Sequence, residues 1–108
     1  MATYEKATSY KLDDTITYAQ GGIISKQVTK NKAGNITLFS FDKDQALTEH
    51  TSPYDAFVQI LDGEAEIRID GQPHVLKKGE CIIMPADHPH ALKATQPFKM
   101  LLTMIRGE

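Results

Sequence analysis

An all-β fold, an antiparallel sandwich or barrel, is predicted by three features of the 108-residue sequence. Short runs in which apolar and polar residues alternate recur along the chain, and Gly and Pro residues stand between them. From about Thr15 onward, no long segment places apolar residues at helical spacing. Many short strands separated by turn signals are typical of all-β sandwiches and barrels. We expect residues 1–108 to form a single domain with one core.

The clearest strand lies in the segment GEAEIRIDG, residues 63–71. Ala65, Ile67 and Ile69 alternate there with charged residues, which places one face of the strand in the core and the other in water. The Asp70–Gly71 pair that follows predicts a tight hairpin, because Gly adopts positive φ angles at low cost. We therefore expect Ile67 to face the core.

Further strands are expected on either side of this hairpin. The five prolines fall between these strands or at their ends, where a missing backbone donor is tolerated. The expected ranges are Gly22 to Thr29, Asn35 to Asp42, Ala56 to Leu61, Glu80 to Met84, His90 to Ala94 and Phe98 to Ile105.

The last of these strands is apolar on both faces. Met100, Leu102 and Met104 lie on one face, whereas Leu101 and Ile105 lie on the other. In so small a protein, such a strand is either central to two packed sheets or covered by a second subunit. We expect a symmetric homodimer, since two-fold interfaces are the commonest oligomeric arrangement.

The overall charge argues against nucleic acid as a partner. The chain has 12 Lys and Arg residues against 14 Asp and Glu residues, a net charge of −2. Binding of phosphate backbones requires a basic surface instead. No run of about 18 apolar residues occurs, and the first residues lack a basic stretch followed by an apolar one. We expect a cytoplasmic protein without a membrane partner.

A single cysteine, Cys81, also favours a reducing compartment, because it cannot form a disulfide within the chain. It opens the apolar run Cys81–Met84. A buried, inert thiol is therefore expected at this position.

Two segments resemble the signature motifs of the cupin family, specifically its small single-domain members (cupin type 2). They are HTSPYDAFVQILDG, which ends a first motif over about 48–63, and GECIIMPADHPHALKA, a second motif over 79–94. The resemblance implies a small antiparallel jelly-roll barrel, also called a double-stranded β-helix. It says little about reaction, because this fold hosts many unrelated activities.

The family's metal site uses three histidines and a glutamate, and the resemblance carries over only half of this set. With Gly63 as the anchor of the first motif, His50 takes the first histidine position, Ser52 the second and Ala56 that of the glutamate. In the second motif, His90 takes the histidine position. The resemblance thus implies that His50 and His90 lie close together at the barrel mouth.

Two imidazoles suit a divalent transition metal such as Zn, Fe, Ni or Mn, although a firm site has three or four protein ligands. The missing ligands could come from His88 or from residues of the first motif, namely Tyr54, Asp55 and Gln59. The alternative is a vestigial site, in which the two histidines bond to each other, to Ser52 or to water.

The resemblance also suggests a pocket inside the barrel. A pocket needs an apolar wall and a few convergent polar groups. The expected polar groups are His50, Ser52 and His90, and the expected wall consists of Ala56, Val58, Ile60, Ile83 and Leu92. Ala56 in place of the glutamate removes a negative charge, which argues against the usual dioxygenase chemistry.

Three functions remain open at this point. The first is binding of a small molecule in the barrel, with a divalent metal held by the two histidines. The second is a metal-dependent enzyme of the dioxygenase or the isomerase and epimerase type, for which the sequence names no catalytic residue. The third is a non-catalytic, dimeric structural or sensory module with a vestigial site.

Overall fold

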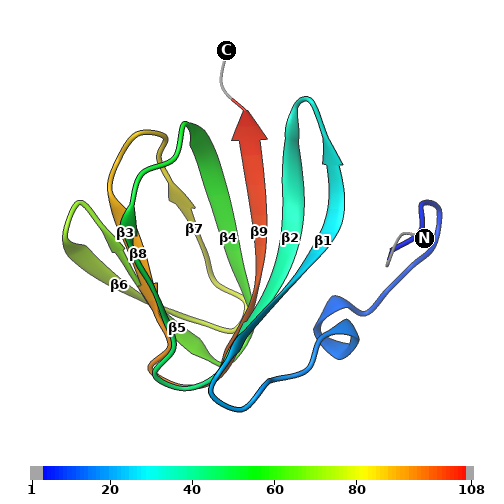
Figure 1. Ribbon diagram of the computed structural model, residues 1–108, viewed down its shortest axis with the longest axis horizontal. Coiled ribbons are helices and arrows are strands. Elements are labelled where there is room, and N and C mark those ends of the chain that lie inside the picture. Colours follow the sequence, from blue (N-terminus) through cyan, green and yellow to red (C-terminus); the bar gives the residue numbers. More distant parts are fainter. Residues whose placement is uncertain (1–3, 107–108) are drawn as a thin grey trace.

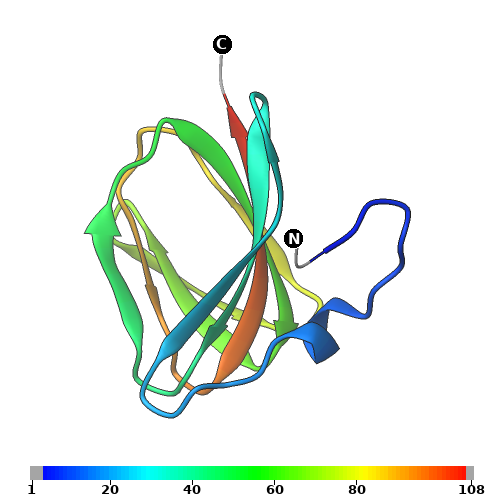
Figure 2. The ribbon, with the colours of Figure 1, turned by 45° about the vertical axis from the view of Figure 1, so that its right-hand side comes forward.

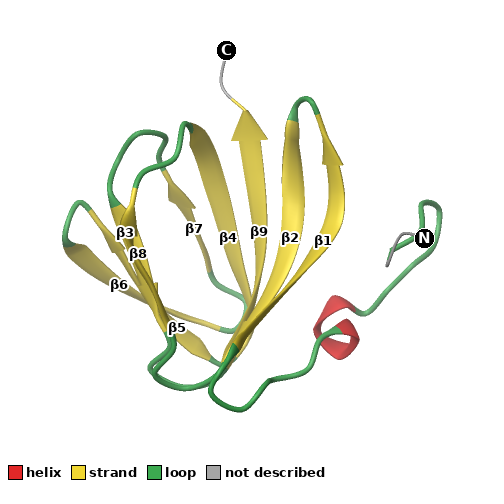
Figure 3. Cartoon of the chain, in the orientation of Figure 1, coloured by secondary structure: helices red, strands yellow, loops and turns green. Residues whose placement is uncertain are grey.

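The computed structural model describes residues 4–106 and contains two antiparallel sheets that face each other (Figures 1 and 3). The five-stranded sheet has the order β1-β2-β9-β4-β7, and the four-stranded sheet has the order β3-β8-β5-β6. The elements are a 3₁₀ turn η1 (Leu12–Thr15) and the strands β1 (Ile23–Asn31), β2 (Gly34–Phe41), β3 (Ala46–His50), β4 (Tyr54–Asp62), β5 (Glu64–Ile69), β6 (Gln72–Lys77), β7 (Cys81–Met84), β8 (His90–Lys93) and β9 (Phe98–Arg106).

This arrangement confirms the predicted fold class, a small antiparallel jelly-roll barrel. From β3 to β9 the chain passes repeatedly from one sheet to the other, so that strands distant in sequence, such as β4 and β9, become neighbours. In the part of the chain that the structure describes, no helix is long and apolar enough to cross a membrane.

The hairpin between β5 and β6 forms as its sequence predicts. Asp70 and Gly71 both have positive φ angles, 52° and 78°. Ile67 is fully buried and pairs with Leu92 of β8, so the predicted inward face of β5 is confirmed. At the other end of the barrel, the rings of Phe41 and Phe98 stack with their centroids 4.6 Å apart.

Strand β7 differs from its prediction in register. Ile83 pairs with Phe57 on the outer face of the sheet and is 60% exposed, whereas Met84 points inward beside Ala56. The expectation that Ile83 lines the interior is therefore wrong. Cys81 has the same parity as Ile83 and is exposed, so the expected buried thiol is wrong as well.

Strand β3 was not expected, and His50 is its last residue. The prediction failed because only Leu47 of its five residues is partly buried. An edge strand of this kind shows no alternation in sequence.

A strand that is apolar on both faces was expected to be either central or covered by a second subunit. Strand β9 is central, because it lies between β2 and β4. Its outer face is partly covered by the amino-terminal arm, residues 4–18, which crosses the sheet (Figure 2). Ile16 of the arm is 2% exposed and belongs to one apolar cluster with Tyr4 and Leu38, against which Leu101 packs.

Hydrogen bonds to main-chain oxygens fasten this arm. Lys99 Nζ donates to the carbonyl of Asp13 at 2.6 Å, and Lys26 Nζ donates to that of Thr15 at 2.6 Å. At the end of the arm, the Tyr18 hydroxyl donates to Asp62 Oδ2 at 2.5 Å. Burial, followed by the Asp62 carboxylate, raises the pKa of Tyr18 well above its ordinary value, so the phenol remains a donor.

Truncating Ile67 to Ala should lower the free energy of unfolding by about 2–5 kcal/mol, because it leaves a cavity in the core. Val75→Ala on the adjacent strand β6 is the control, since Val75 is 55% exposed. Its effect should stay within about 0.5 kcal/mol. Urea denaturation measures both values, and equal effects would contradict the register of β5.

Gly63→Ala should destabilise the protein more than Gly71→Ala, although the two glycines have similar φ angles, 75° and 78°. Both variants place Ala in the left-handed region, at a cost of about 1–2 kcal/mol. A Cβ at Gly63 would additionally lie 2.0 Å from the Pro97 carbonyl oxygen, whereas a Cβ at Gly71 meets nothing within 4 Å. Equal thermal midpoints for the two variants would contradict this close approach.

Candidate functional site

The structure brings His50 and His90 together. His50 ends β3 and His90 begins β8, and the two residues are register partners. Their Nε2 atoms are 3.1 Å apart, and their ring centroids are 4.3 Å apart. Forty residues of sequence separate two imidazoles that are in hydrogen-bond contact in the fold.

The outer nitrogen of each ring faces a backbone carbonyl. His50 Nδ1 lies 2.7 Å from the Thr48 oxygen, and His90 Nδ1 lies 3.2 Å from the His88 oxygen. A carbonyl oxygen only accepts hydrogen bonds, so each Nδ1 carries a proton and donates it. In a neutral imidazole the other nitrogen, Nε2, then has a free lone pair.

Two neutral rings in this state would each turn a lone pair toward the same space. Such a pair is stabilised either by one additional proton, shared between the Nε2 atoms, or by a cation that both nitrogens bind. Carbonyl oxygens that accept from one ring nitrogen and so fix the tautomer are typical partners of histidines that bind metals. The arrangement therefore suits either proton exchange or metal ligation.

The two rings differ in their exposure to water. His90 is 4% exposed, whereas His50 is exposed at the barrel mouth. Burial lowers the pKa of His90 below its ordinary value, and the charge of His50 lowers it further, against the opposing effect of the His88 carbonyl. Near neutral pH, the His90 ring is therefore neutral, with its Nε2 available.

His88 does not join the pair. Its Nδ1 lies 2.8 Å from Asp70 Oδ2, in the turn between β5 and β6, and both side chains are about half exposed. Within residues 4–106, no group of three or more His, Cys, Asp and Glu side chains could hold a metal ion. The expectation of His88 as a third ligand is thus not met, because Asp70 holds its ring at the rim.

The loop before His90 is bonded on both sides. On one side, the Ala86 amide donates to Asp55 Oδ1 at 2.9 Å, and the Asp87 amide donates to the Ser52 carbonyl at 2.8 Å. On the other side, the Asp70 amide donates to the Pro89 carbonyl at 2.9 Å. These bonds fix where β8 starts and thus where His90 lies.

Ser52 and Asp55 consequently form hydrogen bonds that hold the loops in place. The Ser52 hydroxyl accepts a hydrogen bond from the Tyr54 amide at 3.2 Å, within its own turn. Asp55 is exposed and bonds to the Ala86 amide. Gln59 is also exposed, on the outer face of β4. The structure therefore brings none of these three residues to the histidine pair.

The apolar wall is largely as expected. Ala56, Val58, Ile60 and Leu92 point inward and are at most 2% exposed, so they form the packed floor beneath the mouth. Two further side chains lie on the inner face in the same row of register partners as Ala56. They are Asn35 of β2 and Met104 of β9. Sequence reasoning did not assign them to the site, although the alternation in NITLFSF places Asn35 and Thr37 on one face.

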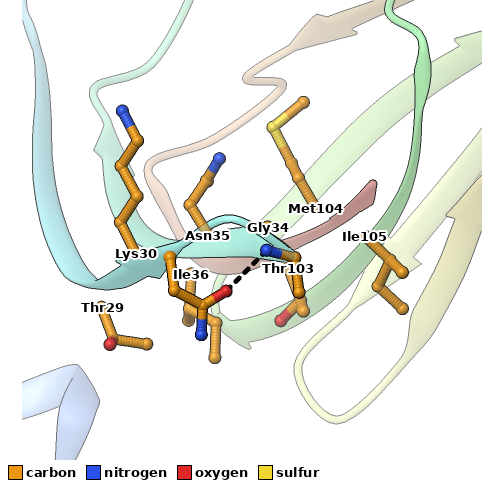
Figure 4. Close-up of a pocket in the computed structure, with 10 residues that line it drawn as sticks. Thr29, Lys30, Gly34, Asn35, Ile36, Thr103, Met104 and Ile105 are labelled. Carbon is orange, nitrogen blue, oxygen red and sulfur yellow. Dashed lines mark hydrogen bonds between the residues drawn. The ribbon is translucent and has the colours of Figure 1, made fainter. Parts of the chain in front are cut away.

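These elements meet at one end of the barrel. Figure 1 shows the turn between β1 and β2, the end of β9 and the loops that follow β3 and β7 at the same end. Asn35 lies at this end on β2, where its Oδ1 accepts from the Thr37 hydroxyl at 3.4 Å. A surface hollow of about 220 Å³ is lined by Asn35 and Met104 (Figure 4) but not by His50 or His90, and a second one of about 210 Å³ includes none of these four residues, so the histidine pair rests on its chemistry.

Metal-free protein should lose stability as the pH falls below 6.5, the ordinary pKa of histidine, because the unfolded chain then binds a proton that folded His90 does not. Above this pH the contribution is fully present. The stability of the wild type relative to His90→Gln should therefore decrease between about pH 8 and about pH 5, as measured by thermal melting. His74→Gln, at an exposed position, should follow the wild type; parallel curves for wild type and His90→Gln would contradict the assignment.

Comparison with known proteins agrees with this architecture. Residues 37–105 match the family model described as Cupin domain. A conserved protein of unknown function from Streptococcus pyogenes is 39% identical, with a TM-score of 0.90 over 96% of this chain and 91% of that one. A search of the curated proteins finds no match.

Two further solved structures extend the likeness. A cupin 2 conserved barrel domain protein from Leptotrichia buccalis is 39% identical, with a TM-score of 0.87 over 90% of this chain, which spans 47% of that protein. A cupin superfamily protein from Desulfitobacterium hafniense is 26% identical, with a TM-score of 0.89 over 96% of this chain and 95% of that one. The match to the family model, together with these relatives, shows that the chain belongs to the cupin family.

Proposed function

We propose that this cupin binds a small molecule at its barrel mouth, through the His50–His90 pair and a divalent metal that the two Nε2 atoms hold. One observation carries the proposal: two Nε2 atoms lie 3.1 Å apart while both Nδ1 atoms face carbonyls. A shared cation removes the conflict between two lone pairs that face the same space.

The donor set fits such a metal only in part. Two imidazole nitrogens suit Zn, Fe, Ni or Mn, but the described residues offer no third ligand. Water and the bound small molecule would fill the remaining positions, so the chain alone would hold the metal weakly. When bound, the metal would act as a Lewis acid toward an oxygen of that molecule.

The lining of the mouth limits the class of molecule. Met104 would contact an apolar part, while the Asn35 amide would bond to a polar group. Asp55, Asp70 and Asp87 at the rim disfavour a highly charged anion. We favour a small, partly apolar molecule with oxygen atoms that can share the metal.

A second candidate is metal-free proton transfer, as in an isomerase or epimerase. It is favoured by the unequal surroundings of the two rings, since His90 is buried with a lowered pKa and His50 is exposed. Two titratable groups in different environments suit acid and base roles. A putative mannose-6-phosphate isomerase from Ralstonia eutropha has the same fold, but at 20% identity it supports the fold alone.

For the location we propose the cytoplasm. The exposed free thiol of Cys81 stays reduced there, whereas an oxidising compartment would favour disulfide formation between molecules.

Elemental analysis of protein purified without a His-tag or chelator, followed by calorimetric titration with Zn²⁺, tests the metal. One Zn²⁺ per chain should bind to the wild type, and His50→Ala and His90→Ala should each weaken binding at least about tenfold. His74→Ala is the matched control, because His74 is exposed on β6.

Unchanged Zn²⁺ affinity in both site variants would refute the metal assignment. A wild type that binds no metal would leave the metal-free candidate, which predicts that a ligand screen finds molecules whose binding His90→Ala removes.

A further inference from the structure

The outer face of the four-stranded sheet carries the surface hollow of about 210 Å³. Leu92 of β8 is 2% exposed and faces the core, so Ala91 and Lys93 on either side of it face outward. His90 has the same parity as Leu92 and is buried as well. The hollow and the histidine pair therefore lie on opposite faces of β8 and are separate places on the molecule.

Two alanines, Ala46 of β3 and Ala91 of β8, make room for the hollow. Their register partners carry long charged side chains, since Ala46 pairs with Lys93 and Ala91 pairs with Arg68 of β5. A methyl group beside such a side chain leaves space above the strand. The resulting volume is far above the roughly 10–15 Å³ that one water molecule requires, so a small organic molecule can enter.

The charged residues that line the hollow are two cations and one carboxylate: Arg68, Lys93 and Glu66. Glu66 is the register partner of Lys93, and Arg68 lies two residues further along β5, diagonally across from Lys93. Residues in this diagonal relation are about 7–8 Å apart, so two long side chains can reach one group between them. The lining carries a net charge of +1.

Glu66 leaves both cations available. Its Oε2 accepts a hydrogen bond from Arg68 Nε at 3.1 Å, with the Glu66 side chain 23% exposed and that of Arg68 53% exposed. Among residues 4–106, the two terminal nitrogens of Arg68 have no hydrogen-bond partner, and Lys93 forms no ion pair. The carboxylate thus holds the guanidinium by its inner nitrogen and leaves its outer edge toward solvent.

We propose that the hollow binds a small carboxylate with a short apolar chain, between Arg68 and Lys93. The planar edge of a guanidinium matches the two oxygens of a carboxylate, and Lys93 supplies a second positive charge. The methyl groups of Ala46 and Ala91 would contact the apolar chain.

The net charge of the lining selects among anions. A single negative charge balances it, whereas a phosphate monoester carries about −1.5 to −2 at pH 7. The additional charge of such a phosphate would meet the Glu66 carboxylate, which is repulsive at this distance from solvent. A monoanion is therefore the preferred ligand of this second site.

An NMR titration of isotope-labelled protein with butyrate tests the site. Butyrate should shift the amide signals of Ala46, Ala91 and Lys93 with one saturable dissociation constant. Arg68→Gln should raise this constant at least about tenfold, because charge-assisted hydrogen bonds are lost. Arg106→Gln is the matched control and should leave it unchanged, since Arg106 is the only other arginine of the chain and is exposed on β9.

A second variant tests the shape of the site rather than its charge. Ala91→Leu keeps every charge but fills the hollow, so saturable binding of butyrate should be lost. If Ala91→Leu does not fold, Ala46→Leu makes the same test at an exposed position of the edge strand β3. Inorganic phosphate is the comparison anion and should bind more weakly than butyrate.

Four results would overturn the proposal. They are the absence of saturable shifts in the wild type, an unchanged dissociation constant in Arg68→Gln, tighter binding of phosphate than of butyrate, and shifts confined to the barrel mouth. The last result would assign butyrate to the histidine pair instead.

Discussion

Burial of β9 on both faces is the constraint on which the rest of this barrel depends. Its inner face carries Phe98 and Met100 into the core, and its outer face carries Leu101, which would meet water in a bare sheet. The neighbouring strands β2 and β4 satisfy its backbone groups, and the arm shields Leu101. The arm covers β9 at Leu101 but leaves Ile105 further along the strand exposed, so apolar surface on the outer face of the sheet stays accessible beyond the arm.

The chemistry of the mouth is determined as much by backbone carbonyls as by the histidines. The Thr48 and His88 carbonyl oxygens accept hydrogen bonds from the two Nδ1–H groups. The two Nε2 atoms therefore present lone pairs to each other instead of N–H donors. Where the family pattern has two more ligands, Ser52 closes a turn and Ala56 joins the packed floor. The departures from the pattern thus remove ligands without disturbing the frame that orients the remaining two.

Some features could be predicted from the sequence because they are local. The alternation around Ile67 and the Asp70–Gly71 pair determine a strand and its hairpin within nine residues. In contrast, the run Cys81–Met84 is apolar throughout, so its sequence does not show which residues point inward, and Ile83 was misplaced. Only the family resemblance could connect His50 with His90, and nothing in either motif indicated that Asp70 would hold His88 away from them.

The attachment of the arm has a consequence for how freely its sequence can change. Lys99 and Lys26 bond to the main-chain oxygens of Asp13 and Thr15, and every amino acid has such an oxygen. The side chain of Asp13 is therefore free to be replaced, with its charge, while the arm remains attached. Ile16 has no such freedom, because its buried side chain is itself the contact. Labels or new surface charges can accordingly be introduced at position 13 without uncovering the sheet.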